Sequence, residues 1–323
     1  RRSFGDRAGL IARIETFTQD SGLPLSLKNF ISYYHLDPRS IYGKFSFSRL
    51  CAAAGVLDDF AEPAESILTK AFSKLVSVDS RRWIKFLTDI LPRFSCELAA
   101  SLSDFEKRML QMFYITVFQE AADWRSHTTQ ANMQLLADSP IMMHELNELL
   151  SFNLERIDFI DQPVPLGFDC PLDLHCTYTR DQILIAMDYM TPKNVREGVK
   201  WLPDKQVDVF FITLNKANKD YSPTTMYNDY SINESLFHWQ SQSTTSDTAS
   251  TGQRYINHRQ RGSKVVLFVR EFKQDSIGAA PYTCLGTAAY VKHTGSKPMN
   301  ITWHLDQPIP AKYLRKTNKL VVG

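Results

Sequence analysis

The sequence predicts an α+β protein, with an N-terminal all-α domain followed by a mostly antiparallel, barrel-like β domain that contains few helices. Up to about residue 155, apolar side chains recur every three or four residues, which is the period of an amphipathic helix. A proline-rich stretch without this period follows between residues 158 and 175. Runs of β-branched and aromatic residues then dominate, separated by Gly, Pro and Ser. We therefore expect a helical domain over residues 1–157, serving as linker or scaffold, and a β-rich domain over 158–323.

Five helices are expected in the first domain, each with Ser, Asp or Pro near its start, over residues 6–19, 63–76, 81–91, 103–119 and 140–154. Two further short helices, over 25–42 and 45–55, are joined by a turn marked by Pro and Gly. Such a pair could form a helix-turn-helix that offers Lys44 and Arg49 to DNA. The alternative is that the two helices are scaffold.

In the second domain a helix is expected after Thr179, over residues 180–189, and strands are expected over 207–214, 264–272, 282–291 and 299–305. The segment 234–245 is predicted to be a strand that runs into a polar loop, with Phe237 and Trp239 on one face. The stretch 241–252 is almost entirely Ser, Thr, Gln and Asp, so we expect a mobile loop at the mouth of the barrel.

Aromatic, amide and hydroxyl side chains are unusually dense in and just before this segment. Aromatic faces beside amides are suited to stacking on a planar polar ligand and reading its edge, and a nucleobase is the commonest such ligand. The residues predicted for base or ligand recognition are Tyr227, Asn228, Tyr230, Trp239, Gln240 and Gln242. The alternative for Trp239 is a place in the core.

Charge is distributed unevenly along the chain. Residues 251–323 contain 12 Lys and Arg against three acids, a local charge of +9, so the first 250 residues must carry −7 to give the net charge of +2. This asymmetry is expected where one region meets a polyanion, although a solvated basic surface would show it too. The predicted phosphate contacts are Lys216, Arg254, Arg259, Arg261 and Lys264.

An enzymatic alternative is a metal-dependent nuclease, in which carboxylates hold Mg²⁺ and a lysine positions water. Asp208 with Glu271 and Lys273 is the set that fits, because a set built from Glu234 and Lys216 has the wrong order along the chain. A Walker loop, a Gly-x-Ser-x-Gly elbow and a His-Glu-x-x-His helix do not occur. We therefore predict no catalytic residue and no cofactor in this piece.

Five scattered cysteines, an odd number, are typical of reduced thiols in a cytosolic protein. Cys170, His175 and Cys176 hint at a metal site, but no second close pair completes it, so no metal is predicted. No signal peptide and no apolar run of about 18 residues is visible, which excludes a membrane span and favours a cytoplasmic location. The start Arg-Arg-Ser leads us to expect a C-terminal piece of a longer protein, or a shortened form of one; the oligomeric state is not indicated.

Six motifs in order make the C-terminal half similar to a known family. They begin at Arg196 (Arg-Glu-Gly-Val), Asp208 (Asp-Val-Phe-Phe-Ile-Thr-Leu-Asn-Lys), Tyr221 (Tyr-Ser-Pro-Thr-Thr-Met-Tyr-Asn-Asp-Tyr), Leu236 (Leu-Phe-His-Trp-Gln-Ser-Gln-Ser), Gly252 (Gly-Gln-Arg-Tyr-Ile-Asn-His) and Pro281 (Pro-Tyr-Thr-Cys-Leu-Gly). These motifs resemble the family called domain of unknown function 3427.

This resemblance implies a bacterial parent protein in which a phospholipase D-like nuclease domain and a superfamily 2 (DEAD/DEAH-type) helicase motor precede this region. ATP and Mg²⁺ would then bind the upstream motor. The implied partners are DNA and the helicase and nuclease domains of the same polypeptide, in restriction or anti-phage defence. The closing strands also resemble PUA- or SRA-type barrels, which inspect flipped or modified bases. A module for docking or autoinhibition of the motor remains the alternative.

Overall fold

The computed structural model describes residues 6–215 and 228–317. The chain divides into two compact units, a helical unit of residues 1–160 with 276–278 and a sheet unit of residues 161–275 with 279–323. Within the described residues, helices come first and a mostly antiparallel sheet follows, so the chain is α+β. No helix in this part of the chain is long and apolar enough to cross a membrane.

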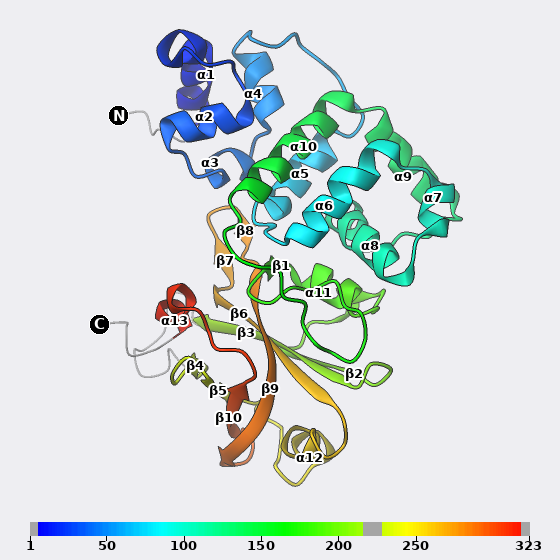
Figure 1. Ribbon diagram of the computed structural model, residues 1–323, viewed down its shortest axis with the longest axis vertical. Helices are drawn as coiled ribbons and strands as arrows, with labels where there is room; N and C mark the ends of the chain where they lie inside the picture. The colour runs from blue at the N-terminus through cyan, green and yellow to red at the C-terminus, as the bar shows by residue number, and fades with distance from the viewer. Residues whose placement is uncertain (1–5, 216–227, 318–323) are drawn as a thin grey trace. The chain divides into compact units, whose positions relative to one another are not determined.

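The helical unit contains the five predicted helices and several shorter ones (Figure 1). Its elements are α1 (Arg7–Ser21), α2 (Leu27–Tyr34), α3 (Arg39–Tyr42), α4 (Phe47–Ala53), α5 (Glu65–Leu75), α6 (Arg81–Ile90), η1 (Leu91–Arg93), α7 (Cys96–Ser101), α8 (Asp104–Phe118), α9 (His127–Ala137) and α10 (Pro140–Glu155).

Polar side chains at the helix starts explain where these helices begin. Ser103 and Glu106 form a reciprocal capping box at the start of α8. The buried Glu145 of α10 accepts hydrogen bonds from the backbone amides of Phe47 and Ser48, at 2.8 and 2.6 Å, and so satisfies the start of α4 from a remote helix. Burial raises the pKa of Glu145, which these donors oppose.

Arg49 of α4 is engaged inside the helical unit. Its guanidinium donates to Glu65 at 2.8 and 2.5 Å and to Asp59 at 2.6 Å, and it stacks over the ring of Phe60 at 4.2 Å. An arginine whose donors are already used has little left for a phosphate or a base edge. The structure therefore gives Arg49 a scaffold role, contrary to the helix-turn-helix hypothesis.

One eight-stranded sheet organises the sheet unit, in the order β2-β3-β6-β9-β10-β5-β4, with β1 paired to β9. Among the strand pairs of this sheet in the described residues, only β3 and β6 are parallel. Along this order the strands do not close, so the predicted barrel is not confirmed for the described residues. The elements are β1 (Thr177–Tyr178), α11 (Arg180–Ala186), η2 (Pro192–Asn194), β2 (Val199–Leu202), β3 (Val207–Asn215), β4 (Tyr230–Ser231), β5 (Leu236–Gln240), α12 (Ser250–Asn257), β6 (Lys264–Phe272), β7 (Gln274–Asp275), β8 (Gly278–Ala279), β9 (Tyr282–Thr294), β10 (Asn300–Leu305) and α13 (Ala311–Thr317).

The inner face of this curved sheet carries a hydrophobic core, and α12 and α13 lie at opposite ends of it (Figure 1). Alternate residues of each strand supply the core, such as Phe210 and Ile212 of β3 and Ile301 and Trp303 of β10. Tyr255 brings α12 into the same cluster. The strands β5 and β10 therefore have one face in the core, and their other face carries the alternate side chains.

The predicted mobile loop over 241–252 is held by hydrogen bonds and ends in a helix. The backbone amide of Ser241 donates to the Met299 carbonyl, and the backbone amide of Met299 donates to the Ser241 hydroxyl, both at 2.8 Å. The backbone amide of Lys297 donates to the Thr245 carbonyl at 2.9 Å. Residues 250–257 form α12. The hydroxyl-rich composition satisfies backbone and side-chain donors within the loop, which the sequence did not reveal.

Candidate nucleic-acid interface

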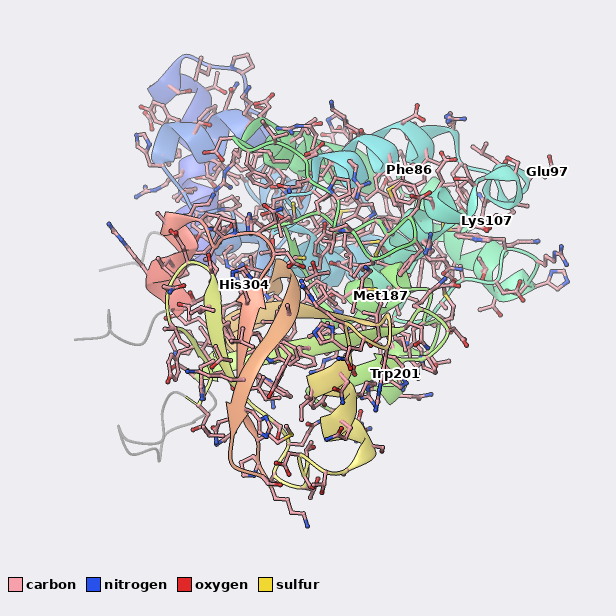
Figure 2. The ribbon with its side chains drawn as sticks, turned by 60° about the horizontal axis from the view of Figure 1, so that its bottom comes forward. Phe86, Glu97, Lys107, Met187, Trp201 and His304 are labelled. Atoms are coloured by element: carbon pink, nitrogen blue, oxygen red, sulfur yellow. The ribbon has the colours of Figure 1, made fainter. Side chains whose placement is uncertain are left out.

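Strand pairing brings polar side chains from four strands together on the outer face of the sheet. Phe237 and Trp239 of β5 point into the core, so His238 and Gln240 lie on the opposite face. On β10 the same alternation places Asn300, Thr302 and His304 outside. We define the β5–β10 face by Tyr230, His238, Gln240, Asn300, His304 and Lys292. Figure 2 labels the exposed His304 on β10.

One row of this face runs across four strands. Tyr230 of β4 pairs with His238 of β5, which pairs with Thr302 of β10, which pairs with Lys292 of β9. A register shift between Thr302 and Trp303 leaves Val291 as an extra residue in β9. This bulge is what turns Lys292 outward while Tyr290 packs against the core.

His238 is the most constrained side chain in the row. Its ring stacks on that of Tyr230, with centroids 4.7 Å apart and planes inclined by 16°. Its Nδ1 lies 2.8 Å from the carbonyl oxygen of Asn228. A carbonyl oxygen only accepts, so Nδ1 carries the proton and Nε2 is left with the lone pair in the neutral ring.

Gln240 and Asn300 form a neighbouring pair of amides. They are opposite each other in the register, and Gln240 Nε2 donates to Asn300 Oδ1 at 3.4 Å. The Gln240 backbone amide donates to the carboxylate of the buried Asp229 at 2.8 Å, which ties the chain before β4 to the end of β5. Both amide side chains are half-buried, so each keeps part of its donor and acceptor capacity at the surface.

Several cations of the sheet unit are exposed or half-buried. Lys292 is exposed within the row itself. Arg259 follows α12 and approaches Asp306, beyond the end of β10, at 3.5 Å while its side chain stays 70% exposed. Arg261 is exposed and Lys264 is half-buried at the start of β6. Of the predicted phosphate contacts, these three are therefore described at or near the surface.

Arg254, another predicted phosphate contact, is used inside the sheet unit. Its Nε and Nη2 donate to the two carboxylate oxygens of Asp208, at 2.8 and 2.9 Å, and its guanidinium stacks over Trp201 at 4.5 Å. Figure 2 labels Trp201 beside α12. Asp208 is fully buried, and burial raises its pKa while Arg254 opposes the rise. Arg254 is thus a structural tie between α12 and β3, because the bidentate pair leaves it 16% exposed.

The predicted nuclease set is not brought together. Asp208 pairs with Val265 near the start of β6, whereas Glu271 lies six residues further along that strand, about 20 Å away at the rise of a strand. Lys273 is exposed just beyond the end of β6. Since Asp208 is also paired with Arg254, this arrangement does not form the metal site that the nuclease alternative requires.

Trp239 lies in the core, 4% exposed and stacked on Phe210 with centroids 4.3 Å apart. Gln242 lies in the loop after β5, where its Oε1 accepts from Thr245 and from the hydroxyl of Tyr255 at 3.1 and 3.2 Å. The structure therefore separates these two residues from Tyr230 and Gln240. Asn228 is exposed beside them, and Tyr227 and Lys216 lie outside the described residues.

No group of three or more His, Cys, Asp or Glu side chains that could hold a metal occurs in the described ranges. The five cysteines, all within the described residues, form no disulfide bond, and Cys170 Sγ donates to the Ala186 carbonyl at 3.6 Å. His175 carries a positive φ of 67° and contacts the ring of Tyr313. Cys170 and His175 therefore contact different residues, and the described structure does not group them as metal ligands.

Sequence reasoning assigned no role to His238, Asn300, Thr302, His304 or Lys292. For His238, Asn300, Thr302 and His304 the signal was the alternation in the predicted segments 234–245 and 299–305, which places these residues opposite the aromatic core positions. Lys292 follows the predicted strand over 282–291 and is turned outward by the bulge at Val291, which alternation does not predict. What the sequence could not supply was the pairing of β5 with β10, because these strands are separated by α12, β6 and β9.

Comparison with known proteins agrees with the family suggested by the six motifs. The search of curated proteins gives no match to the chain. The model of the family described as Domain of unknown function (DUF3427) matches residues 172–316. This range runs from the segment before β1 almost to the end of α13, so it covers the core strands and the β5–β10 face. Residues 172–316 of the sheet unit thus match the DUF3427 family.

Proposed function

We propose that the sheet unit binds DNA through the β5–β10 face and acts as a recognition module of a larger DNA-processing protein. The observation that carries this proposal is the row in which the stacked rings of Tyr230 and His238 share one solvent-facing surface with Lys292. Surfaces that bind single strands combine aromatic rings for the bases with cations for the phosphates. The half-buried amides of Gln240 and Asn300 add groups that can read a base edge.

The family suggests the context of this binding. We infer that the parent protein is a bacterial superfamily 2 helicase with a nuclease domain, that its motor uses ATP and Mg²⁺, and that it acts in the cytoplasm against foreign DNA. In that setting a terminal module that holds DNA would direct the motor and the nuclease to their substrate. Inspection of a flipped or modified base, as in PUA- and SRA-type domains, is a form of recognition that the β5–β10 face could serve.

Binding is favoured over catalysis for this piece. The carboxylate best placed by sequence for metal binding, Asp208, is buried under Arg254, and its two predicted partners are at the other end of β6. A metal-dependent nuclease needs its carboxylates to converge on one ion.

A second candidate, docking of another domain, is favoured by a cavity of about 430 Å³ in the helical unit. Its lining is largely apolar, including Leu87, Leu91, Phe94, Met133 and Leu146. Apolar cavities of this size accept side chains from a partner. Binding of the purified helicase motor, lost on Met133→Glu, would support this second function for the helical unit.

The test of DNA binding is a salt titration with a fluorescently labelled oligonucleotide, followed by anisotropy. Each phosphate contact contributes about 0.7 to the slope of log affinity against log salt for a single strand. Replacing both Lys292 and Arg259 by Ala should therefore lower the slope by about 1.4. Lys273→Ala, an exposed lysine beyond the other end of β6, is the matched control and should leave the slope unchanged. Equal slopes for all three proteins would refute this interface.

A further inference from the structure

His238 presents only one ring face to a ligand. Strand β5 lies between β4 and β10, and Tyr230 of β4 covers one face of the His238 ring by stacking. The other ring face is directed toward the position of Thr302 on β10. The hydrogen bond from Nδ1 to the Asn228 carbonyl, together with the Tyr230 ring, fixes the imidazole in this orientation.

Thr302 of β10, which has a short side chain, is next to that ring face, and Lys292 of β9, which has a long charged side chain, follows across the sheet. Thr302 separates His238 from Lys292 in the row. Neighbouring strands are about 4.8 Å apart, so the β5 and β9 backbones are about 9.6 Å apart on either side of Thr302. This spacing accommodates one planar ring stacked on the imidazole, with the lysine ammonium on its far side. Thr302 is only 8% exposed, so side chains beside it must shift for a ring to lie above it, whereas Lys292 is exposed.

We propose that one unpaired base of DNA stacks on His238 above Thr302, with Lys292 contacting the adjoining phosphate. The inference rests on the proposed DNA binding and names its substrate: a single strand, or a base displaced from a duplex. A base inside a duplex has both faces covered by its neighbours and cannot stack on a protein ring without leaving the helix. Stacking accepts any base, because every base has a flat aromatic face.

Three probes test the inference with the full chain: a short single-stranded oligonucleotide, a fully paired duplex of the same sequence, and that duplex with one unpaired base. We expect the single strand and the duplex with the unpaired base to bind more tightly than the paired duplex. Equal affinity for all three probes would overturn the stacking site while leaving DNA binding intact. No binding of any probe would overturn the proposed function as well.

Variants in the row locate the site. His238→Ala should weaken single-strand binding by about 5- to 150-fold, as expected for loss of one base–aromatic stack. His238→Phe retains a ring and should restore most of that affinity. Thr302→Ile adds bulk where the base would lie and should weaken binding, whereas Thr302→Ser should not. His127→Ala, which removes an exposed histidine at the start of α9 in the helical unit and outside the β5–β10 face, is the matched control with less than about a 2-fold effect.

Circular dichroism and thermal melting of each variant separate loss of binding from loss of fold. A folded His238→Ala or Thr302→Ile protein that binds the single strand as tightly as the unmodified chain would overturn the inference. Should Thr302→Ile unfold, the comparison of His238→Ala with His238→Phe still decides it, because only a stacking role is rescued by a second aromatic ring.

Discussion

Asp208 and Arg254 form an ion pair inside the sheet unit. From the sequence, Asp208 was a candidate metal ligand and Arg254 a candidate phosphate contact, but in the structure each serves as the other's partner. A buried carboxylate requires a partner, and both of its oxygens accept from one guanidinium at 2.8 and 2.9 Å. The two residues are 46 positions apart, so the sequence did not indicate that they pair, and it suggested a different function for each.

We predict that Arg254→Ala lowers the free energy of unfolding by about 3–5 kcal/mol, because it leaves a buried carboxylate without its partner. The double variant Asp208→Asn with Arg254→Met should lose less than Arg254→Ala alone, since it removes both charges. Urea unfolding followed by circular dichroism gives these values. A loss below about 1 kcal/mol for Arg254→Ala would indicate that the pair is dispensable.

Trp239 and His238 are adjacent in the chain and face opposite sides of β5, so they form a matched pair of variants. Trp239→Ala should destabilise the protein by about 3–5 kcal/mol because the indole fills the core beside Phe210. His238→Ala should cost less than about 1.5 kcal/mol, since only a surface ring and one hydrogen bond are lost. Similar losses in thermal unfolding for both variants would contradict the assignment of the two faces.

His175 makes stability dependent on pH in the acid range. Burial, and to a smaller extent the charge of Lys312, lower the pKa of His175 to about 4. The unfolded chain has a histidine pKa of about 6.5, so below that pH it takes up a proton that the folded chain does not. The free energy of unfolding is therefore fully retained above about pH 6.5 and falls as the pH drops toward about 4.

His175→Asn should reduce this loss by about 1–2 kcal/mol, a value discounted for the partial exposure of the ring. Asparagine also tolerates the positive φ of 67° at this position. Urea midpoints at about pH 7.5 and about pH 4.5 measure the effect. An unchanged pH dependence in the variant would show that other groups cause it, among them His258, whose pKa burial also lowers.

Among the secondary-structure elements, α12 depends for its stability on tertiary contacts rather than on the helix propensity and capping of its own sequence. It is eight residues long, and no side chain caps its start at Ala249. Its position is set by Tyr255 in the core and by Arg254 on Asp208. The long helices and the strands β3, β6, β9 and β10 were predictable because their apolar periods extend over many residues. The helix α12 was not, because tertiary packing decides its structure.

Gly252 is where α12 passes closest to the preceding loop. A Cβ at this position would lie 2.1 Å from the Ser246 carbonyl oxygen and 3.0 Å from Met299 Sδ. Alanine favours a helix over glycine by about 1 kcal/mol, but the clash with backbone costs about 1–3 kcal/mol or more. We therefore expect Gly252→Ala to lower the melting temperature, whereas Ser250→Ala at an exposed position of the same helix leaves it nearly unchanged. A more stable Gly252→Ala protein would be evidence against this close approach.

At the scale of the whole molecule, the charge asymmetry of the sequence indicated a region but not a surface. The +9 charge of residues 251–323 includes Arg254, which is internal, Arg259, which is exposed, and Lys292, which lies in the β5–β10 face. Composition counts charges without regard to their partners, and the strand pairing with its bulge at Val291 was needed to place Lys292 in the same row as His238. The sequence thus predicted the segment in which the candidate site lies. It did not predict which residues share the site, because that depends on the long-range pairing of β5 with β10.

Hydrogen–deuterium exchange of the full chain, with and without a short single-stranded oligonucleotide, shows whether DNA binds at the β5–β10 face. We expect the protection gained on binding to be concentrated in the peptides covering residues 228–240 and 291–304, which carry the face on β4, β5, β9 and β10. The same peptides of His238→Ala should gain less protection at equal oligonucleotide concentration. Protection confined to other peptides, with no change in these two, would contradict binding at this face.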